Sequence, residues 1–303
     1  MTGNEGKFPR RFGDKFICRA FLFPTLVVLL FLILYPFVML IYNSFFRYSI
    51  LRPAVPAKFI GIQNYTFFLT DEYTWQRFIF TGKFVIIAVV IQFLLGTTVA
   101  YLFQKKFKGR DILFTLILMP MMLCPIIVGL FWRYLFNSEW GLVNYLISMV
   151  SSVNIDWLGN PNFSFWATII ADTWMWTPFT ILLATAAFSG IPKSLYEAAA
   201  VDGASAPFRF FNITLPLSAP ILVIAVLLRL IDSMKQFDLF YALTGGGPGD
   251  ATQTISYTIY KTAFQYFYTG ESSALAVTLL VIIIGLSSIF VKYLTALSEK
   301  QKA

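Results

Sequence analysis

The chain has 303 residues, of which 58% are hydrophobic and 13% are charged, and its formal net charge is +8. Because soluble domains contain about 25% charged residues, this composition excludes an ordinary soluble domain and predicts an integral membrane protein. The chain contains no histidine, which excludes histidine-dependent catalysis and histidine-ligated metal sites.

A helix needs about 20 mostly apolar residues to span a membrane. Six stretches meet this requirement, which predicts an all-α, polytopic membrane protein with a single domain over residues 1–303. The first stretch lacks the cleavage site of a signal peptide and is expected to remain as an anchor. An alternative count would split the region 78–103 or drop one span. The expected spans are Ala20–Tyr42, Phe84–Phe103, Ile112–Trp132, Phe165–Phe188, Leu215–Ser233 and Ala274–Val291.

Lysines and arginines are concentrated on one side of these spans, with 14 on the side of the N-terminus and 5 on the other. Since positively charged segments remain in the cytoplasm, both termini and segment 190–216 are predicted to be cytoplasmic, and loops 43–77, 136–164 and 234–273 periplasmic. This distribution explains the positive net charge, so no nucleic-acid partner is expected. The inside residues are Lys7, Arg10, Arg11, Lys15, Arg19, Lys105, Lys106, Lys108, Arg110, Lys193, Arg209, Lys292, Lys300 and Lys302, and the outside ones are Arg47, Arg52, Lys58, Arg77 and Lys261.

Two prolines, Pro120 and Pro125, lie inside the third expected span. Proline removes a helical hydrogen bond and kinks the helix, which membranes tolerate where neighbouring groups satisfy the freed carbonyls. A bent span could line a substrate path, although ordinary packing explains the prolines equally well.

The fourth and fifth spans carry polar groups at membrane depth, where a charge costs about 2.5–3.5 kcal/mol even on insertion scales. The charged residues of the fifth span alternate in sign and could pair with one another along the helix surface. Alternatively, its polar residues face a water-filled cavity and bind a polar solute by hydrogen bonds, while Trp174 or Trp176, together with Phe179 of the fourth span, stacks against it. The fourth span contributes Asp172, Thr173, Trp174, Trp176 and Phe179, and the fifth contributes Arg229, Asp232, Ser233 and Gln236, followed by Lys235 and Asp238.

A polar island, residues 191–216, lies between these two spans. Ser194 and Glu197 have the spacing of a capping box, and the alanines that follow favour a helix. Gly203 can take the left-handed conformation that ends this helix. Ser205 can begin a second short helix, which is expected to end before Leu215.

The spacing of this island resembles the EAA loop of permease subunits in binding-protein-dependent ABC importers. The matching residues are Glu197, Ala198, Ala199, Gly203, Ile213, Leu215 and Pro216. The resemblance implies the type I importer fold, in which the first short helix is the coupling helix that contacts the ATPase. It therefore implies an ATPase-coupling role for Glu197, Ala198, Ala199, Asp202 and Gly203.

Two further segments resemble the carbohydrate class of these permeases. The cluster Gly245–Gly249 within the second one is not a phosphate-binding loop, because no Walker A sequence occurs in the chain. The physical role of this segment stays open, and a contact with the external binding protein is one interpretation. The matching residues are Phe59, Gly61, Asn64 and Tyr65, and then Phe237, Asp238, Thr244, Gly246, Gly247, Pro248, Thr252, Tyr260, Ala263 and Phe264.

The resemblance implies one permease subunit of a carbohydrate importer in the bacterial inner membrane, surrounded by lipid. Its implied partners are a different permease subunit, a homodimeric ATPase that binds the ATP, and a periplasmic substrate-binding protein. No cofactor is expected in the chain, and no convergent catalytic set suggests an enzyme. An anionic sugar or glycerophosphate is an alternative cargo, since Arg229 would suit an acidic group. A secondary transporter is a further alternative, but it needs ion-coupling carboxylates and often an internal repeat.

Overall fold

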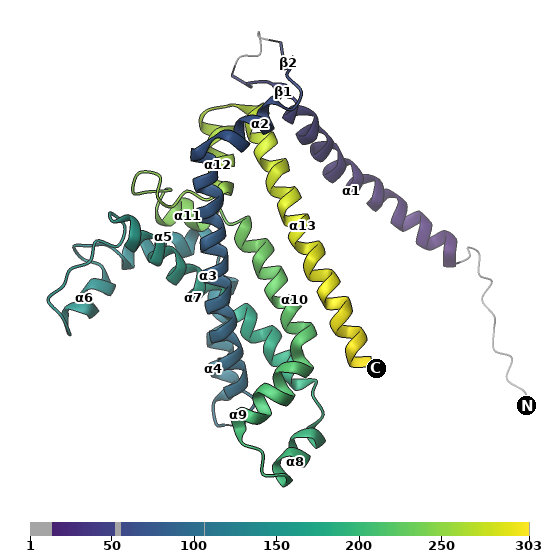
Figure 1. Cartoon of the computed structure of the whole chain (residues 1–303), viewed down its shortest axis with the longest axis vertical. Helices are drawn as coiled ribbons and strands as arrows, with labels where there is room; N and C mark the ends of the chain where they lie inside the picture. The colour runs from purple at the N-terminus through teal and green to yellow at the C-terminus, as the bar shows by residue number, and fades with distance from the viewer. Residues whose placement is uncertain (1–13, 52–55, 106, 303) are drawn as a thin grey trace, which may run out of the picture.

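The computed structural model describes residues 14–51, 56–105 and 107–302, so Lys7, Arg10, Arg11, Arg52 and Lys106 of the orientation argument lie outside the described residues. The described chain is mostly helical, with loops between the helices and a two-stranded antiparallel hairpin at one end (Figure 1). The elements are α1 Asp14–Ser44, β1 Phe46–Arg47, β2 Lys58–Phe59, α2 Gln63–Thr70, α3 Glu72–Leu102, α4 Arg110–Leu118, the 3₁₀ turn η1 Met119–Met122, α5 Pro125–Leu135, α6 Leu142–Ser148, α7 Pro161–Ser189, α8 Lys193–Val201, α9 Ala206–Arg209, the π turn η2 Phe210–Thr214, α10 Leu215–Met234, α11 Asp238–Leu243, α12 Ile255–Tyr260, the π turn η3 Lys261–Gln265 and α13 Thr269–Lys302.

Among the described residues, four helical stretches are long and apolar enough to span a membrane: Arg19–Ser44, Glu72–Leu102, Ala206–Met234 and Thr269–Ala296. Two bent pairs of helices also qualify, one joining α4 and η1 to α5 and the other joining α7 to α8. When each pair counts as one span, the total is the expected six. Helix α3 runs unbroken, so the alternative that splits the region 78–103 is wrong.

The third span departs from the expectation of one kinked helix over Ile112–Trp132. Its two halves are bent by 100° relative to each other. Leu123 and Cys124 between them have extended backbone, with ψ of 148° and 133°. Proline disfavours helical backbone at the residue before it, so Pro125 ends one helix and begins the next.

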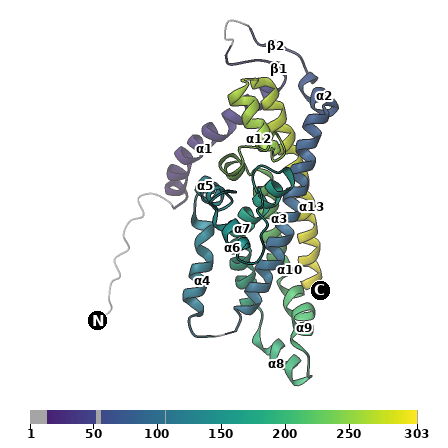
Figure 2. The same cartoon turned by 90° about the vertical axis from the view of Figure 1, so that its left-hand side faces the viewer.

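Helix α1 stands apart from the rest of the bundle. It packs against α13 near the hairpin and then diverges from it, as both views show (Figure 1 and Figure 2). None of the 18-residue stretch that qualifies it as a span is buried. A helix that is apolar all round in this way is typical of a membrane span, which is covered by lipid or by another protein chain.

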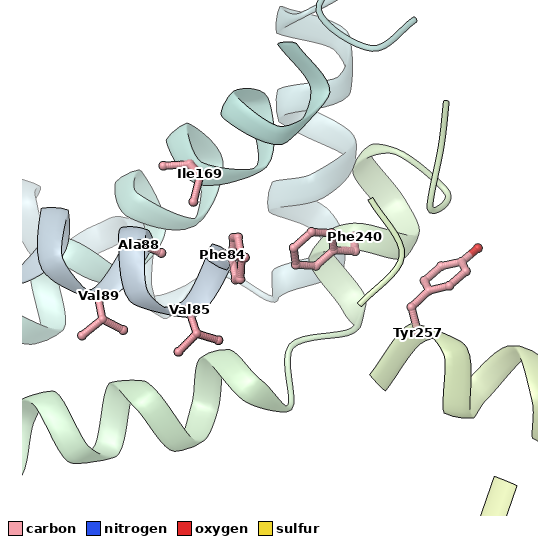
Figure 3. Packing of buried hydrophobic residues seen from close by; sticks show 7 residues of the cluster. All are labelled: Phe84, Val85, Ala88, Val89, Ile169, Phe240 and Tyr257. Carbon is pink, nitrogen blue, oxygen red and sulfur yellow. The ribbon is translucent and has the colours of Figure 1, made fainter. Parts of the chain in front are cut away.

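The core of the bundle lies where α3 crosses α7. At Gly96 of α3 a Cβ atom would lie 2.6 Å from the Cβ of Thr180, so only glycine allows the two backbones to approach this closely. Nearer the N-terminal end of α3, apolar side chains pack between α7 and the segments that follow α10. These residues, shown in Figure 3, are Phe84, Val85, Ala88, Val89, Ile169, Phe240 and Tyr257.

The polar island forms two helices with a left-handed glycine between them, as predicted for Gly203, whose φ is +74°. Two details differ from the prediction. The capping box does not form, because α8 already begins at Lys193, which places Ser194 inside the helix. The second helix does not end before Leu215, because a π turn carries it directly into α10 through a hydrogen bond from Leu215 N–H to the Phe210 carbonyl.

The segments that resemble the carbohydrate class build the opposite end of the bundle. Asn64 Nδ2 donates to the carbonyls of Ser44 at 2.8 Å and Phe46 at 3.2 Å, which fastens α2 to the end of α1. Thr252 Oγ1 donates to Thr244 Oγ1 at 2.7 Å and to the Gly247 carbonyl at 2.8 Å, which closes the glycine-rich loop. These residues therefore have a structural role in the loops.

Because α3 and α7 approach each other closely, we expect alanine to destabilise the protein at one glycine of α3 and not at another. Gly96→Ala forces the new methyl group against Thr180 and should lower the free energy of unfolding by about 1–3 kcal/mol. The matched control is Gly82→Ala, because a Cβ at Gly82 meets nothing within 4 Å. Thermal unfolding of both variants in detergent measures the effect, and equal melting temperatures would contradict the proposed tight crossing.

Candidate functional site

A buried polar network lies where α3, α7 and α10 meet. Arg229 of α10 forms an ion pair with Asp172 of α7, with 3.1 Å between Nη2 and Oδ2. Its Nε donates to Gln92 Oε1 of α3 at 2.8 Å, and its Nη2 also donates to Ser233 Oγ at 2.8 Å. Gln92 Nε2 in turn donates to Asp172 Oδ2 at 2.8 Å. Four side chains from three helices therefore form one connected polar cluster, here called the Arg229 network.

The charges of the Arg229 network are almost completely removed from solvent. The side chains of Arg229 and Asp172 are 2% and 0% exposed. Burying two charges costs several kcal/mol each unless the pair has good geometry and additional hydrogen bonds, which Gln92 and Ser233 provide here. Removing either charged partner alone would leave an uncompensated charge between the helices.

The fifth span pairs its charges along its own surface only in part. Arg229 reaches across to α7, whereas Asp232 pairs with Lys235 at 3.4 Å. Both members of that second pair are about half exposed, so solvent screens the interaction. Asp232 therefore lies on a different side of α10 from the Arg229 network, while Ser233 belongs to the network and Gln236 is buried beyond it.

Several polar side-chain atoms of α7 and of the end of α10, the helices that carry Asp172 and Arg229, are buried without a hydrogen-bond partner. The hydroxyls of Thr173 and Thr177 are two of them. In contrast, Thr97 and Thr98 of α3 donate to the carbonyl four residues earlier, at 2.6 and 2.7 Å. Because buried polar groups normally have partners, these atoms have hydrogen-bonding capacity left for water or for groups that are not part of this chain. The other unpartnered atoms here are Asp172 Oδ1, Trp176 Nε1, Arg229 Nη1 and Gln236 Nε2.

The two tryptophans of the fourth span have different surroundings. The Trp176 ring lies 4.7 Å from the Arg229 guanidinium carbon, in a cation–π arrangement. Trp174 instead packs on α5, with ring centroids 6.1 Å from Phe131 and 5.9 Å from Trp132. Trp176 is thus the tryptophan that belongs with the Arg229 network, and Phe179, which is partly exposed, follows it on α7.

Sequence reasoning missed two residues of this region. Gln92 connects Arg229 to Asp172. The only feature of the sequence that could have indicated this role is a single amide side chain in the middle of an apolar span. Trp132, next to Trp174, has another indole nitrogen without a hydrogen-bond partner. From the sequence, it was expected only as the last residue of the third span. Only the 100° break in that span brings α5 alongside α7.

The residues predicted to couple to an ATPase lie at the far end of the molecule from the hairpin, on and just after α8 (Figure 1). They do not contact the Arg229 network. Glu197, Ala198, Asp202 and Gly203 are exposed, and Ala199 is partly buried. Most of the surface of the short helix α8 is therefore exposed.

A second polar cluster fastens the glycine-rich loop to α3 at the opposite end. Asp250 forms ion pairs with Arg77 at 3.2 Å and with Lys261 at 3.7 Å, and it accepts a hydrogen bond from Tyr73 at 2.8 Å. Burial lowers the pKa of Lys261, but the hydrogen bond with Tyr266 and the charge of Asp250 outweigh it, so this pKa is raised. Lys261 therefore stays charged, and the cluster serves to hold the loop in place.

Comparison with known proteins identifies the family. The family model described as binding-protein-dependent transport system inner membrane component matches residues 92–300. The trehalose/maltose transport system permease protein MalF of Thermococcus litoralis is 36% identical over 272 residues, which cover 89% of this chain and 90% of that protein. The sulfoquinovosyl glycerol transport system permease protein SmoG of Agrobacterium fabrum is 34% identical over 280 residues, which cover 92% and 91% of the two chains.

A solved structure confirms the fold. One chain of a bacterial ABC transporter involved in the import of the acidic polysaccharide alginate aligns with a TM-score of 0.81 and 20% identity, covering 93% of this chain and 96% of that one. The predicted type I importer fold and the resemblance to sugar-class permeases are thus confirmed. Permeases of this kind are transport proteins rather than enzymes, and they work with an ATPase and a binding protein. The chain belongs to the family of inner membrane components of binding-protein-dependent transport systems, the permease subunits of ABC importers.

Proposed function

We propose that this chain is one of two different permease subunits of an ATP-driven importer that carries a neutral carbohydrate across a bacterial inner membrane. A homodimeric ATPase binds the ATP and contacts α8, and a periplasmic binding protein delivers the cargo at the opposite end. Both termini and segment 190–216 lie in the cytoplasm, and loops 43–77, 136–164 and 234–273 lie in the periplasm. Lipid surrounds the spans.

The unpartnered polar atoms beside the Arg229 network carry this proposal. Carbohydrates present many hydroxyl groups, and each can donate and accept hydrogen bonds. Thr173 and Thr177 offer free hydroxyls, and Trp176 offers an indole N–H together with a ring face. The names of the two relatives, one for trehalose/maltose and one for sulfoquinovosyl glycerol, support a sugar or sugar derivative.

A neutral cargo is favoured because the charge of Arg229 is already balanced. Asp172 lies 3.1 Å away, so the pair as a whole has no net charge for an acidic cargo to neutralise. The observation that favours the alternative, an anionic sugar or glycerophosphate, is the unpartnered Nη1 atom of Arg229. The same pairing speaks against a secondary transporter, since Asp172 already has a fixed counter-charge where an ion-coupling carboxylate would need a mobile one.

Arg229 and Asp172 are enclosed between helices in this conformation, so cargo reaches them only after α7 and α10 move apart. Such a movement is the alternating access of an importer. In the proposed cycle, ATP closes the two ATPase subunits, their movement displaces α8, and the spans open outward. This chain contributes the path and the coupling helix, and the ATPase contributes the energy.

Glu197→Lys tests the coupling role of α8. The reversed charge on the exposed face of α8 should disrupt the contact with the ATPase and abolish cargo uptake, while the subunits still co-purify. Uptake into proteoliposomes and ATP hydrolysis are measured together on the complete transporter. Uptake at the wild-type rate would rule out a coupling role for this surface.

A double variant separates cargo binding from folding at the Arg229 network. Arg229→Ala alone would leave Asp172 buried and unpaired, at a cost of about 3–5 kcal/mol. Arg229→Met combined with Asp172→Asn removes both charges together, which such sites often tolerate. We expect the complex to assemble and to hydrolyse ATP at its basal rate, but to lose the stimulation by loaded binding protein.

The matched control for this test is Arg110→Met combined with Asp111→Asn. These residues form a 3.5 Å ion pair remote from the Arg229 network, and Asp111 is almost fully exposed. The control should keep its stimulated ATP hydrolysis. Normal stimulation in the Arg229/Asp172 variant as well would show that the ion pair serves only to hold the helices together.

Asp172→Asn alone tests the preference for neutral cargo. The variant leaves the guanidinium of Arg229 without its counter-charge, which lowers the stability of the complex. It should also favour an acidic sugar over its neutral analogue by about tenfold relative to the wild type, near the lower end of the range for a hydrogen bond to a charged group. Stimulation of ATP hydrolysis by matched neutral and acidic sugars measures this ratio. A wild-type transporter that already prefers the acidic sugar would establish the alternative cargo.

A further inference from the structure

Helix α8 has little contact with the rest of the described chain. It extends beyond the end of the bundle (Figure 1 and Figure 2). Of its nine residues, only Tyr196 and Ala199 are partly buried, and the other seven are exposed. These two lie three residues apart, on the one face of α8 that turns toward the bundle.

Tyr196 joins this face to the start of α10. Its hydroxyl oxygen lies 2.9 Å from Thr214 Oγ1, and the two groups share a hydrogen bond. Thr214 is completely buried and is the last residue of the π turn that leads into α10. Its Oγ1 also donates to the Arg209 carbonyl at 3.4 Å, which leaves its lone pairs available to accept from Tyr196.

The acceptor is held firmly in place. Ser218 Oγ donates to the Thr214 carbonyl at 2.6 Å. Phe210, at the other end of the same π turn, packs against Tyr101 of α3 with ring centroids 4.9 Å apart and against Phe188 of α7 at 6.4 Å. The π turn is thus anchored on two other spans, whereas α8 is joined to α7 by residues 190–192 and to α9 by residues 202–205.

We propose that the Tyr196–Thr214 hydrogen bond is a strut that makes α10 follow the movement of α8. With connections at its two ends only, a short helix can pivot without moving the bundle. The third connection, through Tyr196, removes that freedom. Arg229 lies 15 residues beyond Thr214, about 22 Å along a helix, so a displacement at Thr214 is transmitted to the Arg229 network.

This proposal rests on the proposed coupling role of α8 and adds Tyr196 and Thr214 as positioning residues. Tyr196→Phe and Thr214→Val each remove one hydroxyl and keep the volume of the side chain. Both variants should assemble, bind the ATPase and hydrolyse ATP at the basal rate. Cargo transported per ATP hydrolysed should fall about threefold to tenfold, the range that corresponds to one hydrogen bond. The assay uses the complete transporter with its binding protein in proteoliposomes.

The double variant distinguishes a shared bond from two separate effects. If the two hydroxyls act through one hydrogen bond, Tyr196→Phe/Thr214→Val should lose no more coupling than either single variant. Tyr293→Phe and Thr295→Val on α13 are the controls, because both residues are exposed and Thr295 bonds only within its own helix. Both controls should transport normally.

Three results would overturn the strut: normal coupling in both single variants, additive losses in the double variant, or losses matched by a lower melting temperature of the complex. Failure of the strut can be distinguished from failure of the proposed coupling role. If Glu197→Lys uncouples transport while Tyr196→Phe and Thr214→Val do not, α8 is still the coupling helix but the strut is wrong. If Glu197→Lys has no effect, the coupling role itself is wrong.

Discussion

The arrangement of the spans depends on one requirement, that the guanidinium of Arg229 must be neutralised inside an apolar bundle. Asp172 from α7 and Gln92 from α3 meet this requirement, so a single arginine fixes the relative positions of three helices. The crossing of α3 and α7 at Gly96 allows the close approach that this contact needs. In the proposed transport cycle this closed site opens when other polar groups replace the lost contacts, and a cargo rich in hydroxyl groups supplies them.

Most of the fold could be predicted from the sequence, because membrane spans obey simple rules of length and hydropathy. Five of the six expected stretches coincide with one long helix each and the third with a bent pair of helices, and Gly203 takes the backbone conformation expected of it. The predictions that were wrong concern hydrogen bonding at the ends of helices. Ser194 lies inside α8 rather than at its cap, and the chain passes into α10 through a π turn rather than a break. Such choices depend on tertiary contacts that local patterns do not contain.

The candidate site could be predicted only in part. Charged residues at membrane depth marked Asp172 and Arg229, but the alternating charges of the fifth span allowed either pairing along the helix surface or an orientation toward a water-filled cavity. Only the packing of α7 against α10 shows that Arg229 pairs with Asp172 and leaves Asp232 to Lys235. Gln92 lies 80 residues before Asp172, and no local pattern connects two residues so far apart.

The break between α4 and α5 also restricts what can surround the molecule. Acyl chains offer no hydrogen-bonding groups, so backbone that leaves the helical pattern cannot face them. Met122 and Leu123, at the break, are 80% and 44% exposed in the isolated chain. This side of the third span must therefore be turned away from the lipid annulus, toward water or another subunit. A short irregular stretch thus sets the rotation of the whole bundle about the membrane normal.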